Sequence, residues 1–237
     1  MSTAAVTTER RDGVLIVHLD DGKANALSFD MIGALDAALD EAEGDDDIRA
    51  MVLHGRPGKF SAGFDLGVMF GDDISAIICL VADGGALVRR MYGSSVPVVA
   101  ASTGHALAAG ALLLLGCDVR IAGDVEAKVG LNEVAIKMVL PDWALTIAAD
   151  RLSKRHLQRA LANARLTNPR DAVDVGFIDE VVPEGEELDR AIAVASELAS
   201  TLDPSAYART VRAVRGPVLD LMAEQVASDR SAGVSPI

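Results

Sequence analysis

The chain has 237 residues, half of them hydrophobic but only 3% aromatic, and is long enough for one large domain with a substantial core. Lys and Arg number 22 against 35 Asp and Glu, and the net charge of −13 argues against wholesale binding to a nucleic-acid backbone. The two cysteines, Cys79 and Cys117, form no CxxC pair. That spacing indicates neither a zinc site nor a disulfide framework and fits a reduced cytoplasmic setting.

No segment of the sequence has the pattern of a secretory signal or a membrane span. The N-terminal stretch MSTAAVTTERRDG is polar and lacks an apolar core. The longest apolar run, residues 106–115, contains Gly110 and is too short to cross a bilayer. We therefore expect a soluble, cytoplasmic protein without a membrane partner.

The first part of the chain repeats β-rich runs, glycine-bearing loops and helical patterns. Val14–Leu19 is predicted to be a strand, and Ser28 is an N-cap candidate for a helix through about Ala42. Further strands are predicted at residues 49–54, 96–101, 118–122, 127–130 and 177–182. This order indicates right-handed βαβ crossovers and a layered α/β core, with the ligand at the loops that follow the strands.

Beyond Pro183 the pattern becomes helical. Apolar residues recur at three- and four-residue spacing in residues 186–202, and the segments 204–216 and 217–229 continue in the same way. Such a region packs on its own core or on a neighbouring subunit. We therefore divide the chain into a core, residues 1–183, and a C-terminal helical region, residues 184–237.

Two loops after predicted strands contain the small residues that an anion-stabilising site needs. In KFSAGFDL, residues 59–66, the turn can leave the backbone amide of Phe64 pointing into a cleft. In STGHALAAGA, residues 102–111, a ligand can approach the backbone closely where a helix begins. Because helix N-termini carry unpaired N–H groups, two such loops facing each other can form an oxyanion hole. Either loop alone can also serve tight packing, so that alternative stays open.

The segment GLNEVAIKMVLPDW, residues 130–143, places one carboxylate, Glu133, in a largely apolar run. A carboxylate buried without a cation has a raised pKa, as a proton-transferring base requires. The alternative is that Glu133 points to water from the rim of a strand or helix. Trp143, the only tryptophan, is a candidate packing anchor beneath this loop.

Other catalytic signatures are missing from the sequence. It contains no GxGxxG, GxxxxGK[ST], GxSxG or HExxH motif and no metal-like cluster of His and Cys. We therefore expect neither a bound metal nor a separate cofactor.

Five segments, covering roughly residues 14–183, occur in the order and spacing of the crotonase, or enoyl-CoA hydratase/isomerase, superfamily, which the chain therefore resembles. They are KANALS (23–28), KFSAGFDL (59–66), STGHALAAGALLLLGCDVRIA (102–122), KVGLNEVAIKMVLP (128–141) and ARLTNPRDAVDVGFIDEVVP (164–183). The resemblance implies an α/β fold, a crotonase-like spiral of ββα repeats with a C-terminal helical trimerisation region. It also implies an acyl-CoA thioester substrate, with coenzyme A as part of that substrate, and a homotrimer or dimer of trimers.

The resemblance also implies the site residues. By position the two oxyanion amides are those of Phe64 and Ala109, the latter standing where many relatives have glycine. Of the two glutamates that the family's hydratases use, the first falls at Leu112, which cannot transfer a proton, and the second at Glu133. Substrate-binding positions are expected at Lys23, Ala24, Lys59, Ala62, Asp65, Leu66, Leu112 and Trp143, with Arg56 as a further cation near the phosphates of coenzyme A.

A single carboxylate suits proton transfer between two carbons better than hydration, in which two acidic groups position and split water. The segment around Glu133 is similar to that of the 3,2-trans-enoyl-CoA isomerases. We therefore predict an enzyme of fatty acid metabolism that converts 3-enoyl-CoA to 2-trans-enoyl-CoA, with Glu133 as the sole proton shuttle. Leu112, Val134 and Trp143 are expected to form its apolar surround.

Two alternatives stay open. In the first, the protein is an enoyl-CoA hydratase or related lyase, and the extended loop from Phe70 to Ala76, with Asp72 and Asp73, supplies the second acid. In the second, it binds acyl-CoA without turning it over. Addition of water to 2-enoyl-CoA distinguishes the first alternative from an isomerase. The absence of a reaction with either enoyl isomer identifies the second alternative.

Overall fold

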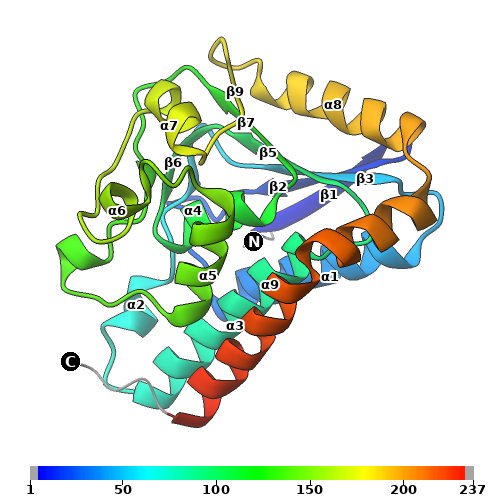
Figure 1. The fold of residues 1–237 in the computed structure, drawn as a ribbon. Helices are drawn as coiled ribbons and strands as arrows, with labels where there is room; N and C mark the ends of the chain where they lie inside the picture. Colours follow the sequence, from blue (N-terminus) through cyan, green and yellow to red (C-terminus); the bar gives the residue numbers. More distant parts are fainter. Residues whose placement is uncertain (1–4, 233–237) are drawn as a thin grey trace.

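Two sheets form the frame of the molecule, which the computed structural model describes for residues 5–232 (Figure 1). Residues 1–4 and 233–237, at the ends of the predicted N-terminal stretch and helical region, lie outside the described residues. The larger sheet has the order β1-β2-β3-β5-β7-β9, with β1 antiparallel to β2 and all other neighbours parallel. Its strands are β1 Val6–Arg11, β2 Val14–Leu19, β3 Ala50–His54, β5 Val98–Ser102, β7 Val119–Gly123 and β9 Glu180–Val182.

The smaller sheet is formed by strands that alternate, along the sequence, with strands of the larger sheet. It consists of β4 Gly58–Ser61, β6 Gly104–Leu107 and β8 Val129–Gly130, which run parallel in that order. The chain therefore alternates between the two sheets: β3, β5 and β7 are each followed by one short strand and then by helical structure. This is the spiral of ββα repeats expected from the sequence, and the predicted fold class is confirmed.

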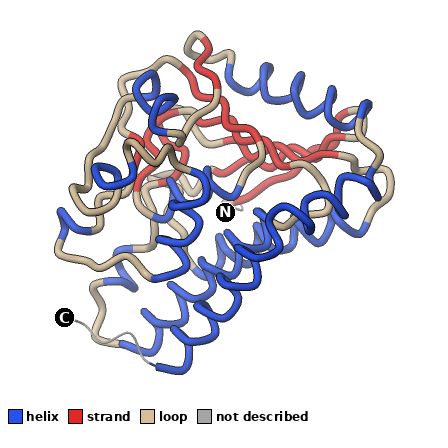
Figure 2. The backbone as a smooth tube through the Cα atoms, viewed as in Figure 1, coloured by secondary structure: helices blue, strands red, loops and turns tan. Residues whose placement is uncertain are grey.

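Helices lie on both sides of the strands (Figure 2). They are α1 Phe29–Gly44, α2 Leu66–Met69, α3 Ile74–Tyr92, α4 Ala109–Gly116, α5 Asp142–Arg151, α6 Leu157–Ala160, α7 Pro169–Val175, α8 Glu187–Thr201 and α9 Pro204–Ala232, with a short 3₁₀ helix at Val134–Ile136. Ser28 caps α1 as predicted, since its hydroxyl accepts a hydrogen bond from the Met31 amide at 3.2 Å. Within residues 5–232, no helix is both long and apolar enough to cross a membrane.

The core has two layers because successive residues of a strand face opposite sides of the sheet. On one face, strand residues such as Ile16, Val52 and Val99 pack against Ala191 and Ala195 of α8. On the other face, the strand residues share one buried cluster with residues of α1, α3 and α4. The strands contribute Leu15, Val17, Met51 and Leu53, and the helices contribute Leu35, Leu87 and Leu113. In Figure 1, α8 accordingly lies on one side of the larger sheet and α1, α3 and α9 on the other.

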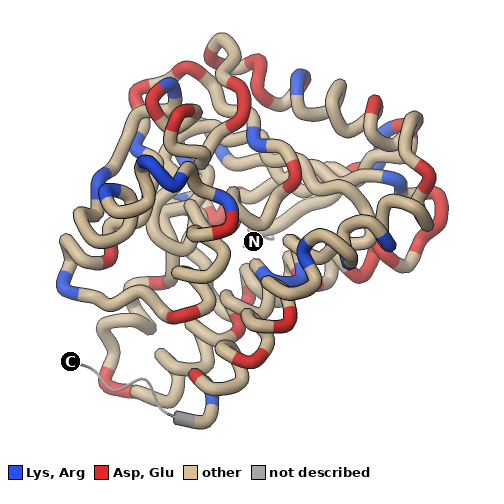
Figure 3. Tube along the Cα trace, in the orientation of Figure 1, with Lys and Arg blue, Asp and Glu red and all other residues tan. Residues whose placement is uncertain are grey.

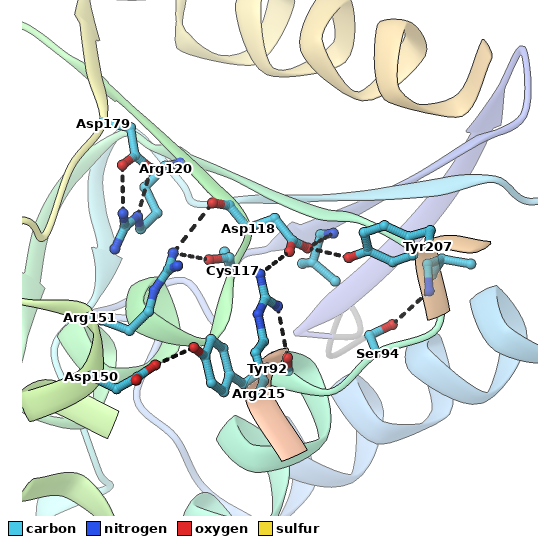
Figure 4. A network of polar contacts seen from close by, with 12 residues as sticks. Tyr92, Ser94, Cys117, Asp118, Arg120, Asp150, Arg151, Asp179, Tyr207 and Arg215 are labelled. Atoms are coloured by element: carbon cyan, nitrogen blue, oxygen red, sulfur yellow. Dashed lines mark hydrogen bonds and ion pairs between the residues drawn. The ribbon is translucent and has the colours of Figure 1, made fainter. Parts of the chain in front are cut away.

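The C-terminal region is helical as predicted, and α9 is one helix that continues through Pro217. It lies against α3 and α5 of the same chain. A partly buried network holds it there (Figure 4): Asp118 accepts hydrogen bonds from the Tyr207 hydroxyl at 3.0 Å and the Arg215 guanidinium at 2.7 Å. The proposed division of the chain at residue 183 and the trimerisation role of this region stay predictions.

Several elements differ from the sequence-based expectation. The strands β4 and β6 overlap the segments 59–66 and 102–111, which were expected to be loops. The edge strand β1 was not predicted, because its sequence VTTERR is polar and almost fully exposed, and it is a strand through pairing with β2. The extended loop expected from Phe70 to Ala76 is correct only in part, because α3 begins at Ile74. Asp73 is the N-cap of that helix and accepts a hydrogen bond from the Ala76 amide at 3.1 Å.

Candidate active site

The loop that contains Phe64, the first of the two expected to form an oxyanion hole, is held by the segment KANALS. The Ala62 amide donates to Ala24 O at 3.0 Å, the Leu27 amide to Gly63 O at 2.8 Å, and the Asp65 amide to Leu27 O at 3.1 Å. These bonds use the backbone groups on either side of Phe64. Within residues 5–232, the Phe64 amide itself donates to no backbone carbonyl, so it is available to a ligand.

The second loop expected to contribute to an oxyanion hole joins β6 to α4 through a strained residue. Ala108 has φ 50° and ψ −126°, a conformation rare for a residue with a side chain. Its amide donates to Gly130 O at 3.0 Å, and α4 starts at the next residue, Ala109. Because the first amides of a helix lack intrahelical acceptors, the Ala109 N–H is free for a ligand. No backbone acceptor for it exists in the described part of the chain.

The two loops touch at Gly63. This residue has φ +96°, and a Cβ atom there would lie 2.9 Å from Ala108 Cβ and 3.3 Å from the Ala109 nitrogen. Glycine is therefore required both for the backbone conformation and for the close approach. It places the loop that carries the Phe64 amide directly against the Ala109 amide. Two free donors on adjoining loops can stabilise a developing oxyanion, as the sequence predicts.

Glu133 is connected to the second loop through the smaller sheet. Leu107 in β6 pairs with Gly130 in β8, three residues before Glu133. The carboxyl group is buried, with the residue 7% exposed, and its Oε2 atom has no hydrogen-bond partner among the described residues. Burial raises the pKa of Glu133 to about 7, and hydrogen bonds from its own amide and that of Asn132 only partly oppose this rise. The alternative of an exposed rim carboxylate is therefore excluded.

Unpaired buried polar atoms gather in this segment. Besides Glu133 Oε2, Asn132 Oδ1 and Trp143 Nε1 are buried without partners in the described structure. Because most buried polar atoms are hydrogen-bonded, such atoms indicate a place for a ligand or water. Sequence reasoning missed Asn132, although it is a second polar residue in the same apolar run.

Of the three residues expected to form the apolar surround of Glu133, two are buried. Leu112 in α4 and Trp143 in α5 are buried, at 1% and 0% exposure. Val134 is 47% exposed, so it does not shield the carboxylate as expected. The reason is local: Val134 is the first residue of the 3₁₀ helix, which turns out toward solvent.

The candidate cations differ in their exposure to solvent and in whether they are paired with a carboxylate. Lys23 is exposed and Lys59 half-buried in β4. The Arg56 Nε atom lies 2.9 Å from Asp20 Oδ1, and its Nη1 donates to Lys23 O at 2.6 Å. Arg56 therefore fixes the loop that carries Lys23 and has less free charge to offer.

Asn25, which sequence reasoning missed, fixes this loop from inside the core. It is fully buried, and its Nδ2 donates to Leu19 O at 2.8 Å and to Phe60 O at 3.1 Å. The side chain thereby joins the end of β2 to β4, just before the Phe64 loop. Its position inside the KANALS motif was the feature of the sequence that could have identified it.

The remaining substrate-binding candidates and the acids of the 70–76 segment lie near the protein surface. Asp65 caps α2 by accepting from the Gly67 amide at 2.8 Å, and Leu66 is 59% exposed. Asp72 and Asp73 are exposed, so neither is placed as a buried acid. Among the Asp and Glu residues in the described part of the chain, Glu133 and Glu187 are the buried ones.

Two surface hollows are lined by residues other than those of the candidate site. One of about 240 Å³ lies between the end of α1 and the start of α9, and one of about 530 Å³ lies beside His105, Lys128 and Thr167. Neither is lined by Phe64, Ala109 or Glu133. The free amides and the buried carboxylate, rather than a surface hollow, therefore locate the candidate active site.

Comparisons with known proteins agree with this geometry. Residues 9–234 match the family model described as enoyl-CoA hydratase/isomerase. The chain is 33% identical to mitochondrial enoyl-CoA delta isomerase 1 of Mus musculus, over 84% of this chain and 70% of the relative. It is 32% identical to an enoyl-CoA hydratase of Mycobacterium tuberculosis, over 87% of this chain and 79% of the relative. The structure of an enoyl-CoA hydratase/isomerase family protein from Pseudomonas syringae superposes with a TM-score of 0.92 at 39% identity, covering 97% of this chain and 98% of that one.

Proposed function

The chain belongs to the enoyl-CoA hydratase/isomerase family, and from this premise we propose that it is an isomerase that converts 3-enoyl-CoA to 2-trans-enoyl-CoA. Glu133 is the single proton shuttle, and the amides of Phe64 and Ala109 form the oxyanion hole. The substrate is an acyl-CoA thioester, so coenzyme A enters and leaves with it and no separate cofactor takes part.

The proposed reaction moves one proton between two carbons. The Glu133 carboxylate removes a proton from C2, and the electron pair of that C–H bond passes into the thioester to give a dienolate. Its oxygen accepts hydrogen bonds from the amides of Phe64 and Ala109; one such donor typically contributes about 10²–10³ in rate. The protonated carboxyl group then returns the proton at C4. The double bond thereby moves from C3–C4 to C2–C3, and nothing is gained or lost.

The observation that carries this proposal is the lone buried carboxylate. The Glu133 Oε2 atom has no partner in residues 5–232, and a pKa of about 7 lets the group both accept and return a proton near neutral pH. The position of the hydratases' other glutamate holds Leu112, which is buried in α4. A single base is sufficient for a proton shift on one face of the substrate.

The hydratase alternative is favoured by the similarity to the hydratase of Mycobacterium tuberculosis. It requires a second acid at the site. The other buried carboxylate among the described residues, Glu187, accepts a hydrogen bond from the Gly185 amide at the start of α8. Asp73 already caps α3. The isomerase is therefore the better supported proposal.

The test is to incubate the purified protein separately with 3-enoyl-CoA and 2-trans-enoyl-CoA and identify the products by mass and conjugated-thioester absorbance. Conversion of the first substrate to the second without added water supports the isomerase. A product heavier by one water from the second substrate would establish a hydratase. Absence of chemistry on both would favour an acyl-CoA-binding protein.

Glu133→Gln then tests the shuttle. The amide has nearly the same shape but cannot accept the proton, so turnover is expected to fall by at least about 10³-fold, while acyl-CoA affinity stays within a few fold. Glu187→Gln is the matched control, since it removes the other buried carboxylate and should preserve turnover. Unchanged turnover in Glu133→Gln would refute the single-base mechanism.

The remaining parts of the proposal concern binding and assembly. Lys23 and Lys59 are the proposed cations near the coenzyme A phosphates, since Arg56 is paired with Asp20. A homotrimer or dimer of trimers and a cytoplasmic setting are proposed from the family resemblance and the free cysteines. Fatty acid metabolism is the proposed context, since an enoyl-CoA is an intermediate of fatty-acid breakdown.

A further inference from the structure

Two consecutive glycines, Gly84 and Gly85, lie buried in the interior of α3. Glycine is among the least favourable residues for a helix interior, so helix formation does not explain them. Both have αR backbone conformations inside the helix, so a positive φ does not explain them either. The remaining reason is the close approach of a neighbour. We call this pair the glycine notch.

The neighbours are the aromatic rings of two candidate site residues. A Cβ atom at Gly84 would lie 2.5 Å from Cζ of Phe64, and Cε1 would be closer still. A Cβ atom at Gly85 would lie 2.7 Å from Cε2 and 2.8 Å from Nε1 of Trp143. Carbon atoms in contact are normally about 3.5–4.0 Å apart. Both rings therefore rest directly on the backbone of α3.

The contact between the Phe64 ring and Gly84 affects the oxyanion hole because the ring and the amide belong to the same residue. The backbone around Phe64 is held on one side by its hydrogen bonds with Leu27. The ring on Gly84 holds the same residue on the other side. A side chain at position 84 must displace the ring by about an ångström, and either the χ angles or the backbone of Phe64 must change.

We propose that the glycine notch positions the oxyanion amide of Phe64, and that Gly84 is a positioning residue for the reaction. Gly85 seats Trp143, the anchor of the segment that carries Glu133, on the same helix. The helix α3 thus fixes the amide and the base segment relative to one another. This inference rests on the proposed function, because it assigns a role in oxyanion stabilisation.

The experiment is to measure kcat and KM of Gly84→Ala with 3-enoyl-CoA. Misplacing a catalytic group by about 1 Å can reduce the rate by about 10²-fold, so kcat is expected to fall roughly 10- to 100-fold. KM should change less than about threefold, because the contacts to coenzyme A are made elsewhere. Gly33→Ala is the matched control: it lies exposed in α1 with no atom within 4 Å of the new methyl group, and should leave kcat unchanged.

A second-site variant distinguishes positioning from a general loss of structure. Phe64→Leu retains the backbone amide but removes the ring atoms that meet position 84. Alone it is expected to lower kcat a few fold. In that background the added Gly84→Ala should cost less than about twofold, because the clash is gone. An equal cost of Gly84→Ala in both backgrounds would overturn the proposal.

A binding readout separates this inference from the isomerase proposal. Bound 3-oxobutyryl-CoA forms an enolate whose absorbance reports on the oxyanion hole whatever reaction the enzyme performs. Gly84→Ala should weaken this signal and Gly33→Ala should not. If the wild-type protein gives the signal but no isomerisation, the notch is supported and the isomerase proposal fails. If Gly84→Ala does not fold, Phe64→Ala replaces it, and an unchanged kcat and enolate signal in that variant would overturn the notch.

Discussion

The properties of Glu133 come from where its carboxyl group lies, because the segment around it contains no cation that pairs with it. Burial favours the neutral acid, and the pKa of about 7 places the change of charge near neutral pH. A base is active only when deprotonated. The same burial that suits the group to the proposed proton shuttle should therefore make the activity sensitive to pH.

The first prediction concerns the rate. kcat/KM for 3-enoyl-CoA should rise with pH through about 7, since the free enzyme needs Glu133 deprotonated. Below about pH 6 it should fall roughly tenfold per pH unit, and above about pH 8 it should be flat. Steady-state rates between pH 5 and pH 9 test this. A plateau that extends below pH 6 would show that Glu133 titrates near its ordinary value of 4.5.

The second prediction concerns stability, with the sign fixed by linkage. Because folding raises the pKa of Glu133, the protonated form adds stability that is fully present below 4.5 and is lost as pH rises through about 7. The rise corresponds to roughly 3 kcal/mol. Glu133→Gln does not titrate, so its stability relative to wild type should improve by roughly 2–3 kcal/mol from pH 5 to pH 8.5. Urea unfolding at both pH values measures this, and a pH-independent difference would contradict it.

At the scale of elements, α9 depends on one partly buried acid. Asp118, at the start of β7, accepts from the Val98 amide, the Tyr207 hydroxyl and the Arg215 guanidinium (Figure 4). The side chains of Asp118 and Arg215 are only 12% and 16% exposed. Arg215 also lies over the Tyr92 ring of α3, 4.5 Å from its centroid. Removal of the acid would leave a largely enclosed guanidinium without its counter-charge.

The third prediction is that Asp118→Ala destabilises the fold by about 3–5 kcal/mol and increases amide hydrogen exchange along α9. The control is Arg212→Ala on the same helix. Its ion pair with Asp220 is 60% and 57% exposed, so its loss should cost less than about 1 kcal/mol. Urea unfolding and hydrogen exchange measure both variants. Equal effects would mean that the network around Asp118 does not hold α9.

The elements also differ in how far sequence alone could predict them. β2 and α1 were predictable because all residues of Val14–Leu19 but His18 are apolar and because Ser28 caps the helix. β1 was not, since its polar residues form a strand only beside β2. Phe64, Ala109 and Glu133 could be named from motif order. The burial that shifts the pKa of Glu133 and the contact of Gly84 with a ring twenty residues away could not, because both depend on packing between distant segments.

At the scale of the whole molecule, the charge of −13 acts on a substrate that is itself anionic. Asp and Glu are spread over the chain rather than confined to one side (Figure 3). Exposed charges repel an approaching coenzyme A thioester over about 30 Å at an ionic strength of 0.01 M but only about 8 Å at 0.15 M. Of the candidate cations, Arg56 is already paired with Asp20. The general repulsion should therefore outweigh the local attraction during approach.

The fourth prediction is that kcat/KM for 3-enoyl-CoA increases a few fold between about 0.01 M and 0.15 M salt. The control substrate is the corresponding pantetheine thioester, which lacks the phosphates and should show no such dependence. Lys59→Gln should steepen the increase, because it removes a local attraction and leaves the repulsion. A decrease of kcat/KM with salt for the coenzyme A substrate alone would mean that cations at the site, rather than the net charge, govern association. Stopped-flow binding at both salt concentrations assigns the effect to the association rate, where long-range charge acts.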